Sequence, residues 1–234
     1  MAINLRDLPK IMRANKWNVG ADLMEHWFSL PAATAPPFTN RQDTIVTMKW
    51  VLSFKRAREV FDKLVRERVW ANDAAQKEIR SMLVRNRLFL SPGATFGVFQ
   101  STQPIIHANA VNFRSVNQDL FDGLDDLAAA LANFNFHVQI GGEVEAAPGA
   151  AKTTVKIMFV GIYVRDQYDF NGDQHLGFWD PKTNRVSAAN PFAGEAVTNK
   201  DFRLWRSANK MGGDFEVFSD VQVLPLARPD VIEV

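Results

Sequence analysis

The chain has 234 residues, 47% of them hydrophobic and 23% charged, so it can bury one sizeable core or a core with a smaller helical module. The net charge of +1 predicts no general attraction to nucleic acid or to an acidic membrane surface. The absence of cysteine excludes disulfides, thiolate metal sites and a cysteine nucleophile.

The first twenty residues carry scattered charges and no apolar block of signal-peptide length. No segment approaches the roughly 18 apolar residues that a membrane-spanning helix requires. We therefore expect a protein that is made in the cytoplasm, has no transmembrane segment and reaches its target without a cleaved signal peptide.

Residues 1–93 are predicted to form a helical region. A short N-terminal helix leads into the proline-containing connection 30–43. Apolar residues then recur at every third or fourth position from 51 to 69, which predicts one long amphipathic helix. A second helix is expected over 73–88, with Asn72 or Asp73 as its candidate N-cap.

Residues 94–234 change to short segments rich in β-branched and aromatic residues. We expect strands at 94–100, 104–113, 134–145, 153–164 and 214–226. One helix, over 117–132, interrupts them, and Asn117 is its candidate cap. The predicted fold class is α+β: an N-terminal helical region followed by a curved, mostly antiparallel β-sheet packed on a helix, with a domain boundary after residue 93.

Chemically reactive side chains are concentrated in residues 166–175, which read DQYDFNGDQH and follow an apolar strand. The carboxylates are ligands for a hard cation, and the imidazole beside them can carry a proton. We expect the strand to end near residue 165, so that Asp166 and Asp169 converge on Mg²⁺ while His175 folds back. Such a site can hydrolyse a phosphate ester.

Two other interpretations of this segment stay open. Asp, Asn and Gly are common in turns, because they tolerate left-handed backbone and bond their own main chain. The spacing of Asp169, Asn171 and Asp173 also resembles the start of a calcium loop. However, Gln174 and Asp180 stand where such a loop needs Gly and Glu.

The residues Asp166, Tyr168, Asp169 and His175 reproduce the order and spacing D-x-Y-D-x5-H. This pattern resembles the catalytic signature of colicin M-like bacteriocins, and the similarity covers roughly residues 115–180. The resemblance implies an Mg²⁺-dependent phosphodiesterase that cuts the cell-wall precursor lipid II between its undecaprenyl chain and its pyrophosphate. It implies metal binding by Asp166 and Asp169, positioning by Tyr168, and general acid or base catalysis by His175.

One departure from the signature concerns anion recognition. The colicin M-like signature continues with arginine directly after the histidine, whereas this chain has Leu176. A guanidinium is a natural bidentate partner for a pyrophosphate, so another arginine is expected to replace it. The candidates for substrate binding are Arg165, Arg203 and Arg206, the last two spaced to lie on one face of a helical turn.

Residues 175–222, from HLGFWDPKTNRV through NKMGGDFEVFSDVQ, also resemble an uncharacterised group of Gram-negative proteins associated with type VI secretion. This resemblance implies delivery by a secretion spike or chaperone into the periplasm of a target cell, and protection of the producer by a cognate immunity protein. Two alternatives remain: a non-enzymatic adaptor or structural protein of the secretion apparatus, and a peptidoglycan glycosidase. A glycosidase would need Asp166 and Asp169 to face each other across a sugar, which their short separation makes difficult.

Overall fold

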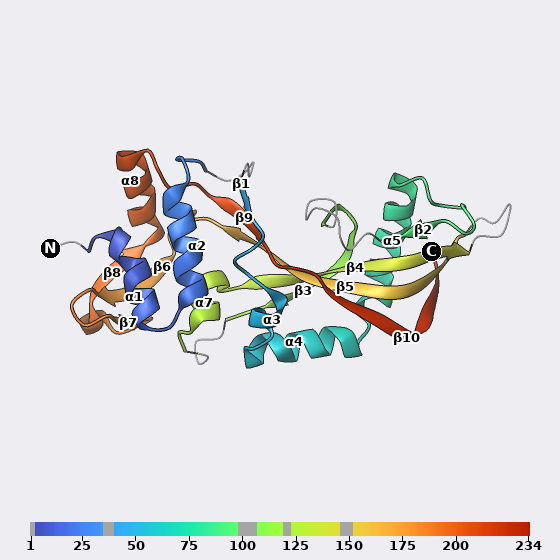
Figure 1. Ribbon diagram of the computed structural model, residues 1–234, viewed down its shortest axis with the longest axis horizontal. Helices are drawn as coiled ribbons and strands as arrows, with labels where there is room; N and C mark the ends of the chain where they lie inside the picture. The colour runs from blue at the N-terminus through green and yellow to red at the C-terminus, as the bar shows by residue number, and fades with distance from the viewer. Residues whose placement is uncertain (1–2, 35–39, 98–106, 119–122, 146–151) are drawn as a thin grey trace. The chain divides into compact units, whose positions relative to one another are not determined.

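The computed structural model describes residues 3–34, 40–97, 107–118, 123–145 and 152–234 (Figure 1). The chain forms two compact units. The first contains Met1–Val46, Asn117–Phe134 and Asp166–Val217. The second contains Thr47–Val116, Asn135–Arg165 and Phe218–Val234. Each unit takes segments from both sides of residue 93, where the sequence suggested a boundary.

The N-terminal part of the first unit contains two α-helices, where the sequence suggested one short helix. A 3₁₀ turn, η1 (Leu5–Asp7), leads into α1 (Leu8–Ala14), and α2 (Asn18–Ser29) follows. These helices lie side by side in Figure 1, and α2 also packs against α7 (Asp126–Leu131). The carboxylate of Asp126 accepts the amide hydrogens of Val19 and Gly20 at 3.1 and 2.9 Å, which satisfies donors at the start of α2.

The strands of the first unit form two groups. Strand β1 (Asn40–Gln42) pairs in parallel with β9 (Phe215–Phe218). A three-stranded antiparallel sheet consists of β6 (His175–Asp180) between β7 (Arg185–Ser187) and β8 (Glu195–Thr198). A 3₁₀ turn, η3 (Pro191–Ala193), precedes β8, and α8 (Asn199–Asn209) follows it directly. The side chains of Thr198 and Asp201 form a capping box that starts α8.

An aromatic cluster fills the core of the first unit. Phe170 stacks on Phe202 with ring centroids 3.7 Å apart, and the indole of Trp27 meets both rings edge-on. Phe28 completes the cluster against Trp205. Burial of such rings is the main stabilising contribution available to this unit, because each removes a large apolar area from water.

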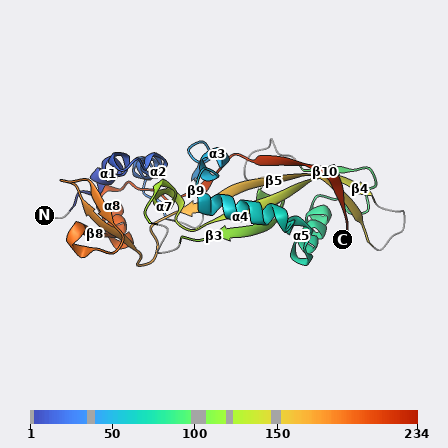
Figure 2. The same cartoon turned by 90° about the horizontal axis from the view of Figure 1, so that it is seen from below.

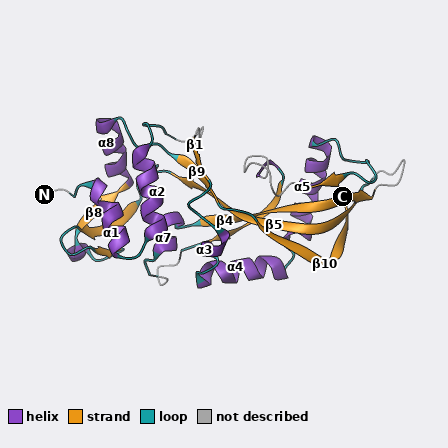
Figure 3. Ribbon diagram, viewed as in Figure 1, coloured by secondary structure: helices purple, strands orange, loops and turns teal. Residues whose placement is uncertain are grey.

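The second unit is an antiparallel sheet with helices (Figure 3). Strand β5 (Thr154–Tyr168) pairs with β4 (Phe134–Glu145) and with β10 (Gln222–Glu233). Strands β2 (Thr95–Phe96) and β3 (Ala110–Val116) pair with β4. The helices are α3 (Met48–Val51), α4 (Lys55–Arg66) and α5 (Asp73–Arg85), with the 3₁₀ turn η2 (Val69–Ala71). Both α4 and α5 pack against β3 (Figure 2).

The sheet bends where two glycines interrupt the β4–β5 ladder. The pairing register shifts between Gly141 and Gly142. A Cβ atom at Gly142 would lie 1.9 Å from the carbonyl oxygen of Lys156, so only glycine permits this approach of the two strands. The expected α+β class, with an N-terminal helical region and a curved sheet packed on helix, is confirmed.

Several predicted elements differ from the observed ones. The helix expected over 51–69 is interrupted, because Ser53 bonds the carbonyl of Trp50 and α4 starts only at Lys55. Of the helix expected over 117–132, residues 119–122 lie outside the described residues; within the described ones the helix covers Asp126–Leu131, and Gly123 before it adopts a left-handed φ of 71°. Its cap is Asp125 instead of Asn117. The strand expected over 214–226 divides into β9 and β10.

A cluster of two imidazoles and a phenol lies within the second unit. The Nδ1 atom of His107 is 2.9 Å from the hydroxyl of Tyr163, and the ring of His137 stacks on that tyrosine. Burial, with smaller contributions from His107 and Arg165, lowers the pKa of His137 to about 3. Burial also raises the pKa of Tyr163. His137 is therefore neutral in the folded protein at any pH where the fold is normally studied.

We expect the protein to lose stability as the pH falls below 6.5. The pKa of His137 is about 3 in the folded chain and about 6.5 in the unfolded chain, so acid favours the unfolded state. This one group should lower the free energy of unfolding by about 1–2 kcal/mol between pH 7 and pH 5. Denaturant titrations of wild type and His137→Phe at both pH values measure the effect.

The variant His137→Phe should show a smaller difference between the two pH values. A residual dependence is expected from His26, whose pKa is also lowered by burial. An unchanged pH dependence in the variant would show that His137 is not the group responsible.

Candidate functional site

The motif residues lie on the end of one strand, a turn and the start of the next strand. Strand β5 continues through Tyr168, so the expectation that it ends near residue 165 is wrong. Asp166 and Tyr168 point to the same face of β5, because side chains alternate along a strand. A turn over 169–174 then connects to His175, the first residue of β6.

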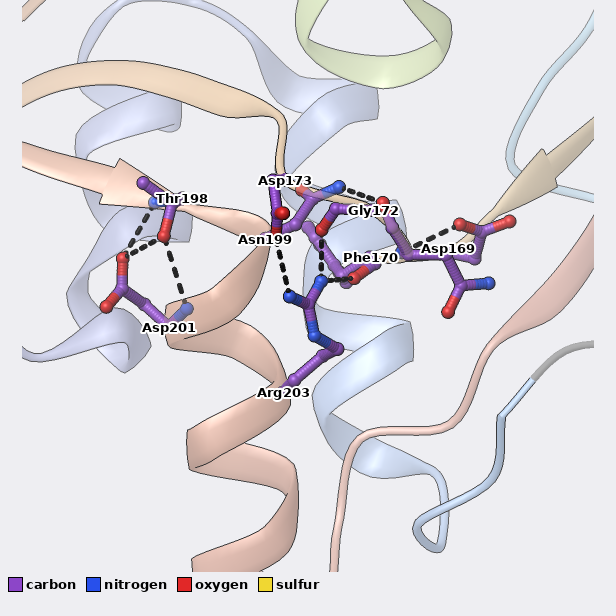
Figure 4. Close-up of polar contacts among 9 residues, drawn as sticks. Asp169, Phe170, Gly172, Asp173, Thr198, Asn199, Asp201 and Arg203 are labelled. Carbon is purple, nitrogen blue, oxygen red and sulfur yellow. Dashed lines mark hydrogen bonds and ion pairs between the residues drawn. The ribbon is translucent and has the colours of Figure 1, made fainter.

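Helix α8 fixes the turn by bonding its main chain (Figure 4). The guanidinium of Arg203 donates to the carbonyls of Phe170, at 2.9 Å, and of Gly172, and to the carboxylate of Asp173 at 3.1 Å. The side-chain amide of Asn199 donates to the carbonyl of Asn171 at 2.6 Å. The turn is therefore held from one side by the first two turns of a helix.

Asp169 begins this turn and contributes to its geometry. Its Oδ1 atom accepts the amide hydrogen of Asn171 at 3.0 Å, the local bond expected of aspartate in a turn. The side chain is half-buried, as is that of Asp166. The turn interpretation and the carboxylate-site interpretation are thus compatible, since one oxygen of Asp169 shapes the backbone and the other is not used in that bond.

Tyr168 is packed into the interior of the first unit. Its ring stacks on Phe215 at 5.0 Å and meets Phe170 edge-on. Burial raises the pKa of the phenol, so Tyr168 remains protonated and can act only as a neutral hydrogen-bond donor or acceptor.

His175 is exposed, and its tautomer is set by the main chain. The amide of Gly177 donates to Nδ1 at 3.1 Å, which places the proton of the neutral ring on Nε2. Gly177 adopts a left-handed φ of 100°, a conformation that favours glycine. The imidazole therefore presents an N–H group and not a lone pair at its outer nitrogen.

The structure brings the four motif residues together around one cavity. Asp166, Tyr168, Asp169 and His175 all line a partly open cavity of about 430 Å³ within the first unit. Helix α1, helix α2 and the segment between them contribute Leu8, Met12, Trp17 and Met24 to its wall. Volumes of this order are typical of small-molecule sites.

The three candidate arginines do not line this cavity. Arg165 belongs to the second unit, and the guanidinium of Arg203 donates hydrogen bonds to the main chain of the turn. Arg206 is buried, bonds the carboxylate of Asp214 and lies over the ring of Trp27. Among the described residues that line the cavity there is no arginine or lysine, and Leu176 is one of them. The expected replacement for the arginine of the signature is thus not found at the cavity.

The cavity provides oxygen ligands for a cation. Within the described parts of the chain, no group of three or more histidine, aspartate and glutamate side chains is arranged to hold a metal. Mg²⁺ is commonly bound by one or two carboxylates, with water and substrate phosphates as its other ligands. Asp166 and Asp169, with the amide oxygens of the same cavity, fit this requirement.

The calcium-loop alternative does not match the observed contacts. Asp173 is 92% exposed and pairs with Arg203, while Asp169 bonds the backbone of Asn171. The carboxylate of Asp180 accepts from the main chain of Lys182 and the hydroxyl of Thr183. These side chains are used in separate turns.

Several residues that line the cavity were not predicted from the sequence, because they belong to no recognisable motif. Trp17 lies between two short helices, and Gln118 and Asn133 flank the segment that contains α7. Asn199 and Gln174 join the cavity through the pairing of α8 with the turn. Only long-range packing identifies them, because single amides and tryptophans have no characteristic spacing.

Comparison with known protein families gives one match that covers almost the whole chain. A family described as "Family of unknown function (DUF6402)" matches residues 3–194 and 193–234, so the chain belongs to it. No curated protein and no solved structure is significantly similar to the chain. None of the described helices has the length and hydrophobicity needed to cross a membrane.

Proposed function

We propose that this member of the DUF6402 family is a hydrolase of phosphate esters that cuts the polyprenyl pyrophosphate linkage of the peptidoglycan precursor lipid II. The observation that carries the proposal is the shared cavity of Asp166, Tyr168, Asp169 and His175. The D-x-Y-D-x5-H spacing, which resembles that of colicin M-like enzymes, supports the choice of substrate.

The carboxylates would hold the cofactor. Asp166 and Asp169 would bind Mg²⁺, which would supply positive charge for the anionic oxygens of the pyrophosphate. This charge matters here, because the described lining of the cavity has carboxylates and no lysine or arginine. Without a cation, an anionic substrate would be repelled.

The four motif residues also act on the attacking water, the phosphoryl group and the leaving group. A carboxylate of the pair takes a proton from the water as its oxygen bonds to phosphorus. The Nε2–H of His175 donates a hydrogen bond to the polyprenyl oxygen as the phosphorus–oxygen bond breaks, and solvent supplies the proton of the alcohol. Tyr168, kept neutral by burial, orients the phosphoryl group as a hydrogen-bond donor.

The biological role consistent with this chemistry is an antibacterial effector. Its substrate lies in the periplasm of a target cell, and we propose that a type VI secretion spike or chaperone delivers the protein there. A producing cell would require a cognate immunity protein.

The direct test is incubation of the purified protein with lipid II in Mg²⁺, in parallel with EDTA. Release of undecaprenol in Mg²⁺ and its absence in EDTA is the expected result. Shortened glycan strands from peptidoglycan would identify a glycosidase, and intact substrates in both assays would favour a non-enzymatic component of a secretion apparatus. Either outcome would overturn the proposal.

A further inference from the structure

A second hollow of the first unit is lined by three basic side chains. Its described wall surrounds about 430 Å³ and consists of Arg6, Pro9, Lys10, Arg13, Glu25 and Phe28. With three cations and one carboxylate, this wall carries a net charge of +2. No residue of the described wall also lines the cavity of the motif. The hollow is therefore a separate feature, and its charge favours an anion.

Two aromatic rings hold Arg6 in place at this hollow. Its Cζ atom lies 5.1 Å from the ring centroid of Phe28 and 5.4 Å from that of Trp205. Phe28 is only 1% exposed and contacts Trp205 edge-on, so the packing of the unit sets the position of both rings. A guanidinium attracted to ring faces loses part of its freedom, while its N–H groups stay available for an oxyanion. Within the described chain, no hydrogen bond or ion pair uses these N–H groups.

The other two cations differ in how far their charge is compensated. Arg13 donates through its single Nη2 atom to the carboxylates of Asp22, at 2.8 Å, and of Glu25, at 2.6 Å. Lys10 is exposed and is not paired with a carboxylate of the described chain. Arg6 and Lys10, four positions apart at the start of α1, therefore bring uncompensated positive charge to the hollow.

We infer that this hollow binds a phosphoryl group through the guanidinium of Arg6 and the ammonium of Lys10. A phosphoryl group carries up to two negative charges, and two of its oxygens match the paired N–H groups of a guanidinium. The inference goes beyond the proposed hydrolysis, because this site is separate from Asp166 and Asp169 and needs no metal. The phosphoryl group belongs either to a soluble molecule or to a phospholipid headgroup, and vesicle binding separates these two sources.

The first test is a titration of the full chain with inorganic phosphate at pH 8 in EDTA. It is followed in NMR spectra by the Nε–H signal of Arg6 and the indole N–H signal of Trp205, over which Arg6 lies. Saturable shifts are expected, and succinate, which carries the same double charge, should bind about fivefold more weakly or less. Equal affinity for succinate would overturn the choice of a phosphoryl group.

The absence of metal keeps this result independent of the proposed hydrolysis. In EDTA the carboxylates of Asp166 and Asp169 repel an anion, so the titration reports on the hollow. Phosphate binding without lipid II cleavage would leave the inference standing and overturn the hydrolysis, and the reverse result would do the opposite.

Three variants that each lose one positive charge separate the site from a general effect of charge. Affinity for phosphate should fall about tenfold in Arg6→Gln and about threefold in Lys10→Gln. The matched control is Lys200→Gln, since Lys200 is exposed on α8 and is not part of the described wall. It should stay within about twofold of wild type. Equal losses in Arg6→Gln and in the control would overturn the assignment of Arg6.

Sedimentation with vesicles identifies the source of the phosphoryl group. Retention of wild type by phosphatidylglycerol vesicles but not by phosphatidylcholine vesicles, and its loss in Arg6→Gln, would identify a lipid headgroup. Phosphate binding without such retention would identify a soluble phosphorylated molecule. Because both measurements are made on the wild-type protein, the absence of saturable phosphate binding together with the absence of retention would overturn the inference.

Discussion

Asp169→Asn is expected to lower kcat for lipid II cleavage by about 10²- to 10³-fold, equivalent to about 3–4 kcal/mol. The substitution removes the negative charge that would hold Mg²⁺ but keeps Oδ1, which accepts the amide hydrogen of Asn171. The turn should therefore retain its shape. Asp166→Asn should have an effect of the same order, and rates at saturating lipid II measure both.

The same turn offers a matched control. Asp173 is 92% exposed and pairs with Arg203, and it is not among the described residues of the cavity wall. Asp173→Asn should change kcat by less than about threefold, because an exposed ion pair contributes little. If Asp169→Asn and Asp166→Asn behave like this control, the carboxylates have no catalytic role.

The dependence on Mg²⁺ distinguishes loss of a metal ligand from loss of a base. Loss of a ligand should raise the Mg²⁺ concentration needed for half-maximal activity, so part of the lost rate should return at high Mg²⁺. Loss of a general base alone should leave that concentration unchanged.

The sequence predicted correctly those elements whose conformation is set by residues close together in the chain. The alternation of Phe134–Glu145 predicted β4 with its observed bounds. Of the two candidate caps of the second helix, Asn72 is the one that caps α5, and its side chain accepts the amide hydrogen of Ala75 at 2.9 Å. The acidic motif was identified for the same reason, because its residues are close together in the sequence.

The remaining features depend on packing between distant segments. The periodicity over 117–132 could not reveal that Gly123 would adopt a left-handed conformation, or that the described helix α7 would begin at Asp126. Trp17 and Asn199 reach the cavity from segments far from the motif in sequence. Spacing also placed Arg203 and Arg206 on one helix correctly, but gave no information on what α8 would pack against.

Arg206→Met is expected to lower the free energy of unfolding by about 3–5 kcal/mol. The side chain of Arg206 is 7% exposed and bonds the carboxylate of Asp214, which is fully buried. The indole of Trp27 donates to the same carboxylate at 3.0 Å. Removing the guanidinium takes the positively charged partner away from a buried carboxylate, and chemical denaturation followed by tryptophan fluorescence measures the loss of stability.

Arg203→Met provides the comparison on the same helix. Its side chain is 34% exposed, and its partners are main-chain carbonyls and an exposed carboxylate. We expect a loss of about 1 kcal/mol, since water can replace part of these interactions. A similar loss in both variants would contradict the assignment of Arg206–Asp214 as a buried pair.

A double-mutant cycle isolates the coupling between the two charges. Asp214→Asn alone leaves an uncompensated guanidinium, whereas Arg206→Met with Asp214→Asn removes both charges and keeps an acceptor for Trp27. The double variant should therefore lose less stability than the sum of the single variants. A substrate-binding Arg206 predicts the opposite pattern: additive, small effects on stability, with a large increase in KM for lipid II. Denaturation and kinetic measurements on the same three variants thus decide between the two roles.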